Sequence, residues 1–417
     1  MTSTTCVSSR VSSPGSASEK SLTVRSRVVA GLSLSFCTDP AHIADQWLAF
    51  ESEAHATLFQ SYKWVSAWCR TSAMACGEQP LIVTGHDANG RLALIWPMAI
   101  VQRLGTCVLT WLGQDCSSYN FGLYRRDTID QIGEAEIRAI FSQITRHRPE
   151  IGAIQFLNQP FEWNGVINPL ARLPSYPAAS RAYALNLRPD FDSLYASIFS
   201  ARNRSTLRRK ERNLVKTGDR KIALAETEAQ RLELLETFLR QKAVQFQNQG
   251  KSNMFADPRM QMFYRELARD SGDGAPFEYA YLSVGDTVAA TFNGMRFQDR
   301  FYFLTTSMDL GELKRWSPGI ILMREHVAHH CRQGTAVFDL GPGQGDHKDA
   351  WHGYEVPLFE THLSLSARGW ATTVLSRTKS QSKLAIKRSP ILWKTARSVR
   401  GLVRALRRSI ISRPNSS

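Results

Sequence analysis

The sequence lacks an apolar run of the ~18 residues that a membrane-spanning helix needs. It has only seven cysteines in 417 residues, an odd number without any Cys-x-x-Cys pair, so neither a disulfide framework nor a zinc ribbon is indicated. A reducing compartment suits such a chain, and we expect a cytoplasmic protein. Hydrophobic residues still make up 43% of the sequence, and the length allows two or three folded domains.

Acidic residues are missing from the C-terminal end. Residues 368–417 contain thirteen Lys or Arg and no Asp or Glu, and residues 1–35 carry a net charge of +3. Because the whole chain carries +15, the body between these ends is close to neutral. A body that binds nucleic acid is therefore not expected.

The two ends also lack the composition of a folded domain. Residues 1–35 are rich in Ser and Thr and are expected to be disordered. The segment ahead of Arg27 has no apolar stretch of a secretory signal, and a transit peptide is an alternative. In the basic tail 368–417, apolar residues recur at helical spacing from Ile391 onward, which predicts an amphipathic helix. Such a helix would bind an anionic membrane surface, at the inner face of the membrane, or membrane-bound synthesis machinery. A helix packed on the body and a disordered tail are the alternatives.

The body contains the same order of expected elements twice: a helix, a hairpin, a strand, a helix and a strand. In the first half these elements are residues 57–74, 81–96, 108–112, 129–145 and 153–157. In the second half they are residues 232–245, 277–293, 301–306, 317–333 and 336–340. The repeat predicts two similar domains, 36–185 and 186–367. Between the halves, residues 198–221 are strongly basic, which indicates either a phosphate-facing patch or a solvated helix face.

The most informative segment is the loop and helix that follow the expected strand 301–306. Lys314 and Arg315 lie in the loop, Ser317 suits the N-cap, and Pro318 suits the first helical position. Exposed backbone N–H groups at this helix start, with Gly319 allowing a ligand to approach closely, would form an anion site. An ordinary capped helix is the alternative.

These residues belong to a longer series of short motifs. Its members are Ser317, Pro318 and Gly319, then Asp339, Gly341 and Gly343, then Lys348 and Trp351. The series resembles the CelD-type acetyltransferase group of the GNAT superfamily, which is associated with cellulose and exopolysaccharide production. That group is related to the Fem-type transferases, which carry tandem GNAT domains. Segments 59–68, 89–97 and 111–113 also resemble it, so the resemblance covers roughly residues 40–365.

The resemblance implies an α/β (α+β) fold with tandem GNAT-like domains, each a mixed, mostly antiparallel sheet flanked by helices. It also implies acetyl-CoA or another acyl-CoA as donor, and an amine or hydroxyl of a sugar, polysaccharide precursor or amino-acid-like molecule as acceptor. The donor's pyrophosphate would lie on Arg315, Ser317, Pro318 and Gly319. Of the superfamily's usual loop, Arg/Gln-x-x-Gly-x-Gly/Ala, only Gly319 is present, one position later than usual, and a longer acyl or aminoacyl donor is an alternative.

Acyl transfer needs a group that removes a proton from the attacking nucleophile and a group that stabilises the developing charge. Asp339 ends a buried strand and would act as base or position the acceptor; a turn-capping carboxylate is the alternative. Lys348 would hold an anionic group, or be a surface lysine. Tyr302 or Tyr281 would donate to the leaving thiolate, or pack.

No metal site is expected from the sequence. His326 and His330 lie one helical turn apart, beside His329, but no third ligand is evident in the local sequence.

Two other functions remain open. Residues 337–345 resemble the first motif of S-adenosylmethionine-dependent methyltransferases, with Glu360 at the distance of a ribose-binding acid, but few residues follow to complete that fold. A non-catalytic docking module of a polysaccharide synthesis complex is the second alternative. The first half lacks a Ser-Pro-Gly start near residues 124–128, so we expect it to be structural or to shape the acceptor site. No Gly-x-Ser-x-Gly elbow, Walker loop or His-x-x-x-Asp motif occurs, so a serine hydrolase, an NTPase and a condensation-type acyltransferase are unsupported.

Overall fold

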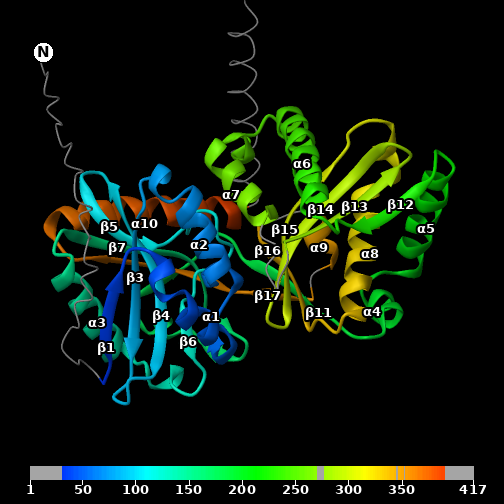
Figure 1. Ribbon diagram of the computed structural model, residues 1–417. Helices are drawn as coiled ribbons and strands as arrows, with labels where there is room; N and C mark the ends of the chain where they lie inside the picture. The colour runs from blue at the N-terminus through cyan, green and yellow to red at the C-terminus, as the bar shows by residue number, and fades with distance from the viewer. Residues whose placement is uncertain (1–30, 270–276, 344–345, 352, 390–417) are drawn as a thin grey trace, which may run out of the picture.

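The computed structural model describes residues 31–269, 277–343, 346–351 and 353–389, which form two lobes side by side (Figure 1). Each lobe is built on one large sheet. The strands of the first sheet are β1 (Ser33–Cys37), β2 (Ala54–His55), β3 (Gln79–His86), β4 (Leu92–Arg103), β5 (Thr106–Trp111), β6 (Leu123–Arg125), β7 (Ile151–Pro160), β10 (Ser175–Pro177) and β18 (Leu358–Ser364). The strands of the second sheet are β11 (Ala182–Asn186), β12 (Arg220–Leu224), β13 (Phe277–Val284), β14 (Thr287–Phe297), β15 (Arg300–Met308), β16 (Val337–Pro342) and β17 (Tyr354–Val356).

Helices cover these sheets, and a two-stranded ribbon of β8 (Glu162–Trp163) and β9 (Val166–Ile167) extends from the first lobe. The helices are α1 (Ala44–Glu53), α2 (Tyr62–Thr71), α3 (Glu134–His147), α4 (Phe191–Ile198), α5 (Ala201–Val215), α6 (Glu228–Gln249), α7 (Pro258–Arg269), α8 (Pro318–Arg332), α9 (Asp346–Trp351) and α10 (Ala367–Arg388).

The predicted repeat of helix, hairpin, strand, helix and strand is confirmed in both lobes. The hairpins are the antiparallel pairs β3–β4 and β13–β14. After each hairpin, a strand pairs in parallel with the strand that follows the next helix: β5 with β7 across α3, and β15 with β16 across α8. The predicted fold class, mixed and mostly antiparallel sheets flanked by helices, is therefore confirmed.

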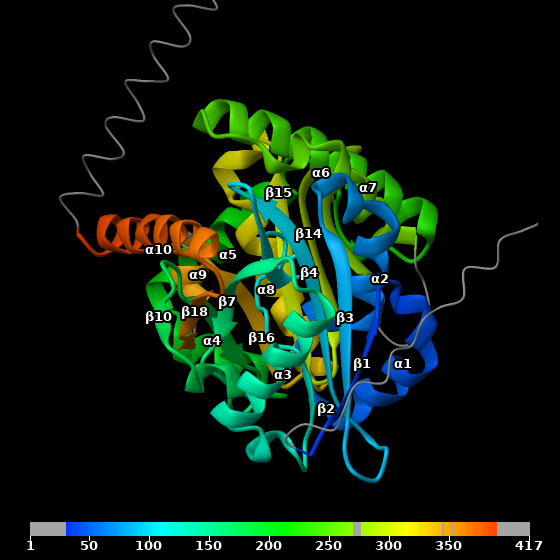
Figure 2. The same cartoon turned by 90° about the vertical axis from the view of Figure 1, so that its left-hand side faces the viewer.

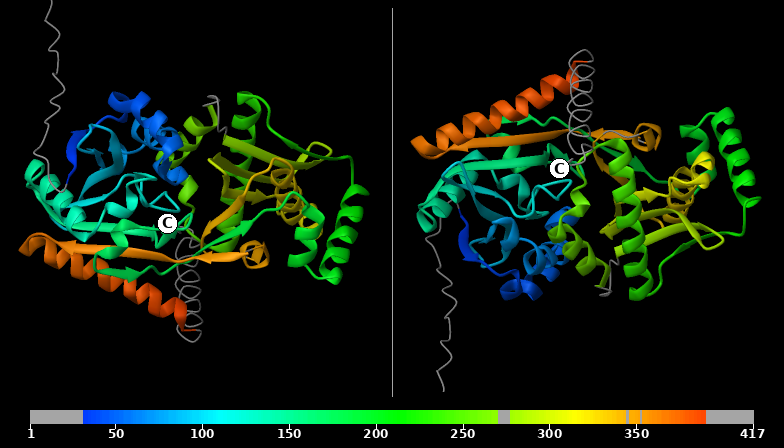
Figure 3. Two further views of the ribbon diagram at one scale, coloured as in Figure 1. Left: turned by 90° about the horizontal axis from the view of Figure 1, so that it is seen from below. Right: turned by 90° about the horizontal axis from the view of Figure 1, so that it is seen from above.

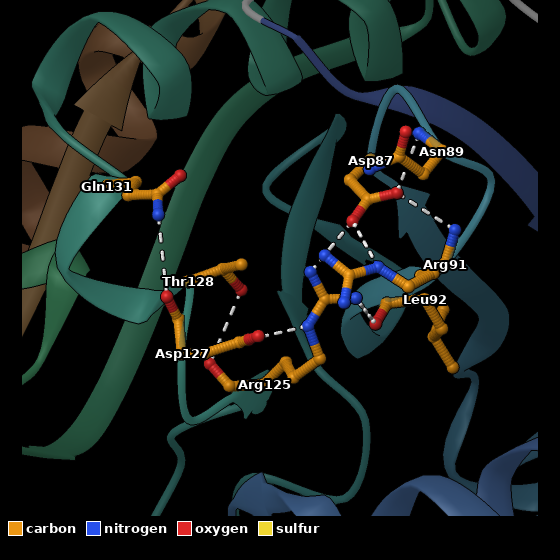
Figure 4. A network of polar contacts seen from close by, with 8 residues as sticks. All are labelled: Asp87, Asn89, Arg91, Leu92, Arg125, Asp127, Thr128 and Gln131. Carbon is orange, nitrogen blue, oxygen red and sulfur yellow. Dashed lines mark hydrogen bonds and ion pairs between the residues drawn. The ribbon is translucent and has the colours of Figure 1, made fainter.

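The first hairpin turn shows how local sequence fixes one of these elements. The carboxylate of Asp87 accepts hydrogen bonds from the backbone N–H groups of Asn89 and Arg91, both at 2.9 Å, and Gly90 has φ +76° (Figure 4). The same carboxylate pairs at 2.9 Å with Arg125, whose guanidinium also donates to the carbonyl of Leu92 at 2.8 Å. A buried arginine is thus used here to pin the turn to β6.

Each sheet is completed by a strand from across the predicted domain boundary. β11 falls, but for its last residue, within the predicted first domain, 36–185, and pairs antiparallel with β16 of the second sheet. β18 falls within the predicted second domain, 186–367, but pairs antiparallel with β7 of the first sheet, along which its orange ribbon lies in Figure 3. The predicted boundaries therefore do not separate the two sheets, because an apolar pattern identifies a strand but not the sheet that it joins.

The predicted tail also begins too early. Residues 367–388, most of which were assigned to the basic tail, form α10, which packs on β5, β7 and β18 of the first sheet (Figure 2). Gly369 makes this contact close, because a Cβ there would lie 1.7 Å from the carbonyl oxygen of Gly152. The amphipathic stretch from Ile391 lies outside the described residues. So does most of the segment 1–35, although β1 already begins at Ser33.

The two lobes share one hydrophobic core. A continuous cluster of buried side chains runs from the first sheet and α2 to α6, α7 and the facing side of the second sheet. At its centre, the rings of Trp64 and Trp68 lie 4.9 and 5.1 Å from the ring of Phe263 in α7. A second cluster fills the space between the other face of the second sheet and α4, α5 and α8. Any group on the facing side of the second sheet is therefore positioned by both halves of the chain.

Candidate donor and catalytic site

The start of α8 differs in detail from the predicted capped helix. Pro318 occupies the first helical position as predicted, and Ser317 occupies the N-cap. However, Ser317 has φ +59°, and its hydroxyl makes no capping hydrogen bond. The hydroxyl instead accepts a hydrogen bond of 2.8 Å from Lys210 Nζ of α5. The first turn of α8 is thus left without a side-chain cap. Pro318 has no N–H, and Ile320 and Ile321 donate theirs to the carbonyl of Ser317, so among the described hydrogen bonds the N–H of Gly319 is left for a ligand.

Positive charge and open space coincide at this helix start. Lys210 brings one cation of the basic segment 198–221 to it, and Arg315 lies in the 3-10 helix Glu312–Trp316 directly before it. The side chain of Arg315 is 60% exposed, over the ring of Trp316 and 3.7 Å from Glu312. A Cβ added to Gly319 would have no atom within 4 Å. Uncapped N–H groups, the positive end of a helix dipole and nearby cations suit a phosphate group.

Beside this helix start, the two parallel strands of the second sheet, β15 and β16, separate from each other. Their pairing runs from Arg300–Val337 to Tyr302–Asp339. A register shift in the β14–β15 pairing between Phe303 and Thr305 places an extra residue in β15 directly after this point. A bulge of this kind bends a strand, so β15 turns away from β16 at its carboxyl end. Asp339 lies where the two strands diverge.

Asp339 is held on all sides. It is 1% exposed, and its Oδ2 accepts a hydrogen bond of 2.8 Å from Arg300 Nη1. Its Oδ1 accepts hydrogen bonds of 2.8 Å from the hydroxyl of Tyr119 and from the backbone N–H of Gly341. Burial raises the pKa of this carboxyl, and the Arg300 guanidinium opposes that rise. With both oxygens engaged, the carboxylate is suited to fixing the geometry of the strand ends.

Four residues of this network were not predicted from the sequence. Arg300 stacks on the ring of Trp163 at 4.3 Å from guanidinium carbon to ring centroid, and its Nη2 donates to Asn164 Oδ1 at 3.2 Å. Trp163, Asn164 and Tyr119 all come from the first half of the chain. A charged residue at the start of a buried strand was a usable signal for Arg300. No local pattern marks the other three, because only the packing of the two lobes brings them to Asp339.

Lys348 lies near the same strand end. It comes from α9, and its Nζ donates a hydrogen bond of 2.7 Å to the carbonyl of Pro342. Gly341, before Pro342, has φ +69°, a backbone conformation that favours glycine. Burial lowers the pKa of Lys348 to about 8, and Asp339 opposes this shift. Lys348 can therefore change its charge near neutral pH.

Tyr302 is placed differently from Lys348. Its ring is fully buried between the lobes, where it meets Phe59 edge-on at 5.7 Å and lies parallel to Trp163 at 6.4 Å. Burial raises the pKa of its hydroxyl above the ordinary value. The structure brings Tyr302 beside Asp339 as a strand partner. Tyr281, the other candidate, faces Lys221, whose Nζ lies 5.8 Å from the ring centroid.

Comparisons with known proteins agree with this architecture. Residues 201–349 match the acetyltransferase (GNAT) domain family, and this span includes β13 to β16, α8 and the candidate site. The crystal structure of FemX is similar, with a TM-score of 0.54 and 13% identity over 76% of this chain and 96% of FemX. A conserved protein of unknown function from Bacteroides thetaiotaomicron VPI-5482 has a TM-score of 0.51 and 12% identity over 79% and 99%. Among curated proteins, none matches the sequence.

The family match supports a GNAT acetyltransferase domain within the second half of the chain. At 12–13% identity, the likeness to the two solved structures concerns the fold alone. Of the helices within the described segments, none is both long and apolar enough to cross a membrane. The methyltransferase alternative gains no support, because β16, which carries its motif, pairs in parallel with β15 but antiparallel with β11.

Proposed function

We propose that the protein transfers an acyl group from acyl-CoA, with acetyl-CoA as the first choice of donor, to an amine or hydroxyl. The observation that carries this proposal is the uncapped start of α8, which lies in the segment matching the GNAT domain, with Lys210 and Arg315 near its open end. In this proposal, Arg315, Ser317, Pro318 and Gly319 hold the pyrophosphate of the donor. The acyl thioester then extends along the diverging ends of β15 and β16.

The chemistry that follows is a nucleophilic substitution at the thioester carbon. The acceptor's nitrogen or oxygen forms the new bond, the bond to the CoA sulfur breaks, and the nucleophile loses a proton. Asp339 is proposed to position the acceptor, since its oxygens already accept hydrogen bonds from Arg300, Tyr119 and Gly341. Lys348 is proposed to hold an anionic group of donor or acceptor. Tyr302 is the proposed proton donor to the leaving thiolate, and this is the role that its burial supports least.

We propose a sugar, a polysaccharide precursor or an amino-acid-like molecule as acceptor, in exopolysaccharide or cell-envelope biosynthesis. This finer statement rests on the resemblance of the motifs from Ser317 to Trp351 to the CelD-type group. A non-catalytic docking module in a polysaccharide synthesis complex is the second candidate. Measurable acyl transfer distinguishes the two.

The direct test is isothermal titration of the purified full chain with acetyl-CoA, longer acyl-CoAs and S-adenosylmethionine, followed by a turnover assay that detects free CoA thiol. We expect saturable binding of an acyl-CoA and thiol release that depends on an amine or hydroxyl acceptor. Binding of acyl-CoA without thiol release for any acceptor class would favour the docking module. Binding of S-adenosylmethionine instead of acyl-CoA would contradict the proposal.

The basic tail is proposed to bind an anionic membrane surface or membrane-bound machinery, on its composition alone. Flotation with anionic liposomes tests it: the full chain should float at low salt, and a chain ending at residue 388 should not. Equal behaviour of the two would contradict the membrane proposal.

A further inference from the structure

A second cluster of polar groups lies on the opposite face of the second sheet from Asp339. His326 and His330 occupy successive turns of α8, and their side chains are 2% and 1% exposed. Glu278, the second residue of β13, extends toward them. The Nε2 atoms of the two histidines are 3.2 Å apart, and Glu278 Oε2 lies 3.6 Å from that of His326 and 3.4 Å from that of His330.

This triangle has the dimensions of three ligands around one metal ion. Zinc binds histidine nitrogen and carboxylate oxygen at about 2.0–2.2 Å, and two vertices of a tetrahedron with such bonds are about 3.3–3.6 Å apart. The three observed separations, 3.2 to 3.6 Å, fall on or beside this range. Each of the three residues thus offers one ligand atom within reach of a shared ion.

Hydrogen bonding within the cluster leaves one atom unsatisfied. Glu278 Oε2 is buried and makes no hydrogen bond of ordinary geometry within the described structure. A buried carboxylate oxygen without a partner costs free energy, on the order of several kcal/mol for a charged group. A divalent cation at the centre of the triangle would satisfy this oxygen and both imidazole nitrogens together.

The surroundings resemble those of a metal site rather than those of a surface polar cluster. The other ring nitrogen of His330, Nδ1, lies 3.1 Å from the hydroxyl of Thr335, a contact that fixes the ring orientation. Phe301 packs 4.0 Å from the ring of His330 and Phe292 packs 4.9 Å from the ring of His326, which gives the cluster an apolar shell. A cavity of about 310 Å³, lined by His326 and His329, opens beside the cluster and provides an entry path.

We propose that Glu278, His326 and His330 bind one divalent transition-metal ion of the zinc class. The ion would link α8 to β13 on the face of the sheet away from Asp339, so its role is structural. Since the first turn of α8 is the proposed donor site, the ion would hold that helix on the sheet without contacting substrate. The proposal depends on the described side chains alone and stands whether or not the acyltransferase proposal holds.

The test starts with untagged full-length protein, freed of metal by a chelator and titrated with zinc against a chromophoric competitor. We expect one equivalent bound, and melting at a higher temperature with zinc than without. Cobalt(II) in place of zinc should give the visible absorption of a tetrahedral nitrogen–oxygen site. No competition for zinc by the wild-type protein would overturn the proposal.

Thiols are the alternative zinc ligands, because the described cysteines are free. An intense near-ultraviolet band from thiolate to cobalt would therefore overturn the assignment to Glu278 and the two histidines. Glu278→Gln keeps the shape of the side chain and should weaken zinc binding at least about 100-fold. His329→Gln, on the same helix but outside the triangle, is the matched control and should bind like wild type. If Glu278→Gln does not fold, the cobalt spectrum of the wild-type protein decides the question alone.

Discussion

Both halves of this chain contain a helix that connects two parallel strands, but the residues at the start of that helix differ in charge between the halves. In the first half, α3 follows β5, and the backbone N–H of Gly133 at its N-cap donates to Glu136 Oε2 at 2.9 Å. Glu134 adds a second carboxylate to that first turn. In the second half, α8 follows β15 with no acidic residue in its first turn, and Lys210 reaches its N-cap.

This difference shows that topology alone does not make an anion site. A helix start attracts a phosphate through its N–H groups and dipole, and carboxylates of the protein at the same place oppose this attraction. In the first half, Glu136 accepts from the N-cap N–H and Glu134 adds a second negative charge, so an anion would be repelled. In the second half, the first turn of α8 has no acidic residue.

The parallel strand pairs of the two halves also differ: the pair in the first half is apolar and the pair in the second half is polar. The third residue pair of the parallel β5–β7 ladder is Leu109–Ile154, and both side chains are buried and apolar. The third pair of the β15–β16 ladder is Tyr302–Asp339. The first half instead contributes across the interface, through Tyr119 and Trp163. One half of the chain thus supplies contacts to the network of the other.

We expect the largest effect, on donor binding, from placing at the start of α8 the negative charge that the start of α3 carries. Gly319→Glu places a carboxylate at the start of α8, as Glu134 and Glu136 do in α3. We expect acyl-CoA binding to fall at least about 100-fold, because like charges would meet at the pyrophosphate and the helix N–H groups would gain an internal acceptor. Isothermal titration measures the loss.

The matched control for this variant is Gly319→Ala. The added Cβ has open space, so the variant should fold, and because it adds no charge its loss of donor affinity should be much smaller than that of Gly319→Glu. Circular dichroism should show both variants folded. Equal donor affinity of wild type and Gly319→Glu would contradict the donor assignment.

The next effect concerns the strand ends that distinguish the second half. Asp339→Asn and Lys348→Ala should lower turnover by roughly 100-fold while changing donor affinity little, because both side chains follow the strand on the proposed acceptor side. Asp339→Asn also leaves Arg300 buried without its anion, at a cost of about 3–5 kcal/mol, so its rates must be measured well below its melting temperature. A change confined to the Michaelis constant for CoA would move both residues to the donor site.

The pH dependence of kcat/KM distinguishes a role of Lys348 as a cation from a role as a base. Its pKa is lowered to about 8, so a role as cation predicts that kcat/KM falls as pH rises through about 8. Lys348→Arg should keep kcat/KM constant there, and a rise of kcat/KM through pH 8 in the wild-type enzyme would instead indicate a base.

The same pKa also affects stability. The unfolded chain binds this proton up to the ordinary lysine pKa of 10.5 and the folded chain only to about 8, so the free energy of unfolding of the wild-type protein should increase with pH between these values. Lys348→Met should be more stable at pH 7, on the order of 2 kcal/mol.

We expect the smallest effect from removing a contact that the first half makes to Asp339. Tyr119→Phe removes the hydroxyl that donates to Asp339 and should destabilise the protein by about 1–2 kcal/mol, with a moderate loss of turnover. Tyr124→Phe is the control, because that hydroxyl is equally buried but makes no hydrogen bond of ordinary geometry within the described residues. Urea unfolding curves compare the two. Similar stability of both variants would mean that Tyr119 does not support Asp339.

Particular residues show how far sequence reasoning reaches. The turn at Asp87 and the start of α8 at Pro318 were predictable, because a turn and a helix end depend on residues a few positions apart. Ser317 is the N-cap as predicted, but the partner of its hydroxyl could not be predicted, since Lys210 lies more than a hundred residues earlier. The roles assigned to Asp339, Lys348 and the donor residues stay predictions.

The sequence by itself determined the periodic elements, their repeated order and the charge of each segment, because periodicity and capping act within about one turn or one strand. Only the tertiary structure decided which sheet β11 and β18 join, since any strand of suitable pattern can pair with either open edge. It also decided which distant groups meet: Tyr119 with Asp339, and Glu278 with His326 and His330. Such contacts arise from packing across many residues, and a local pattern contains no information about them.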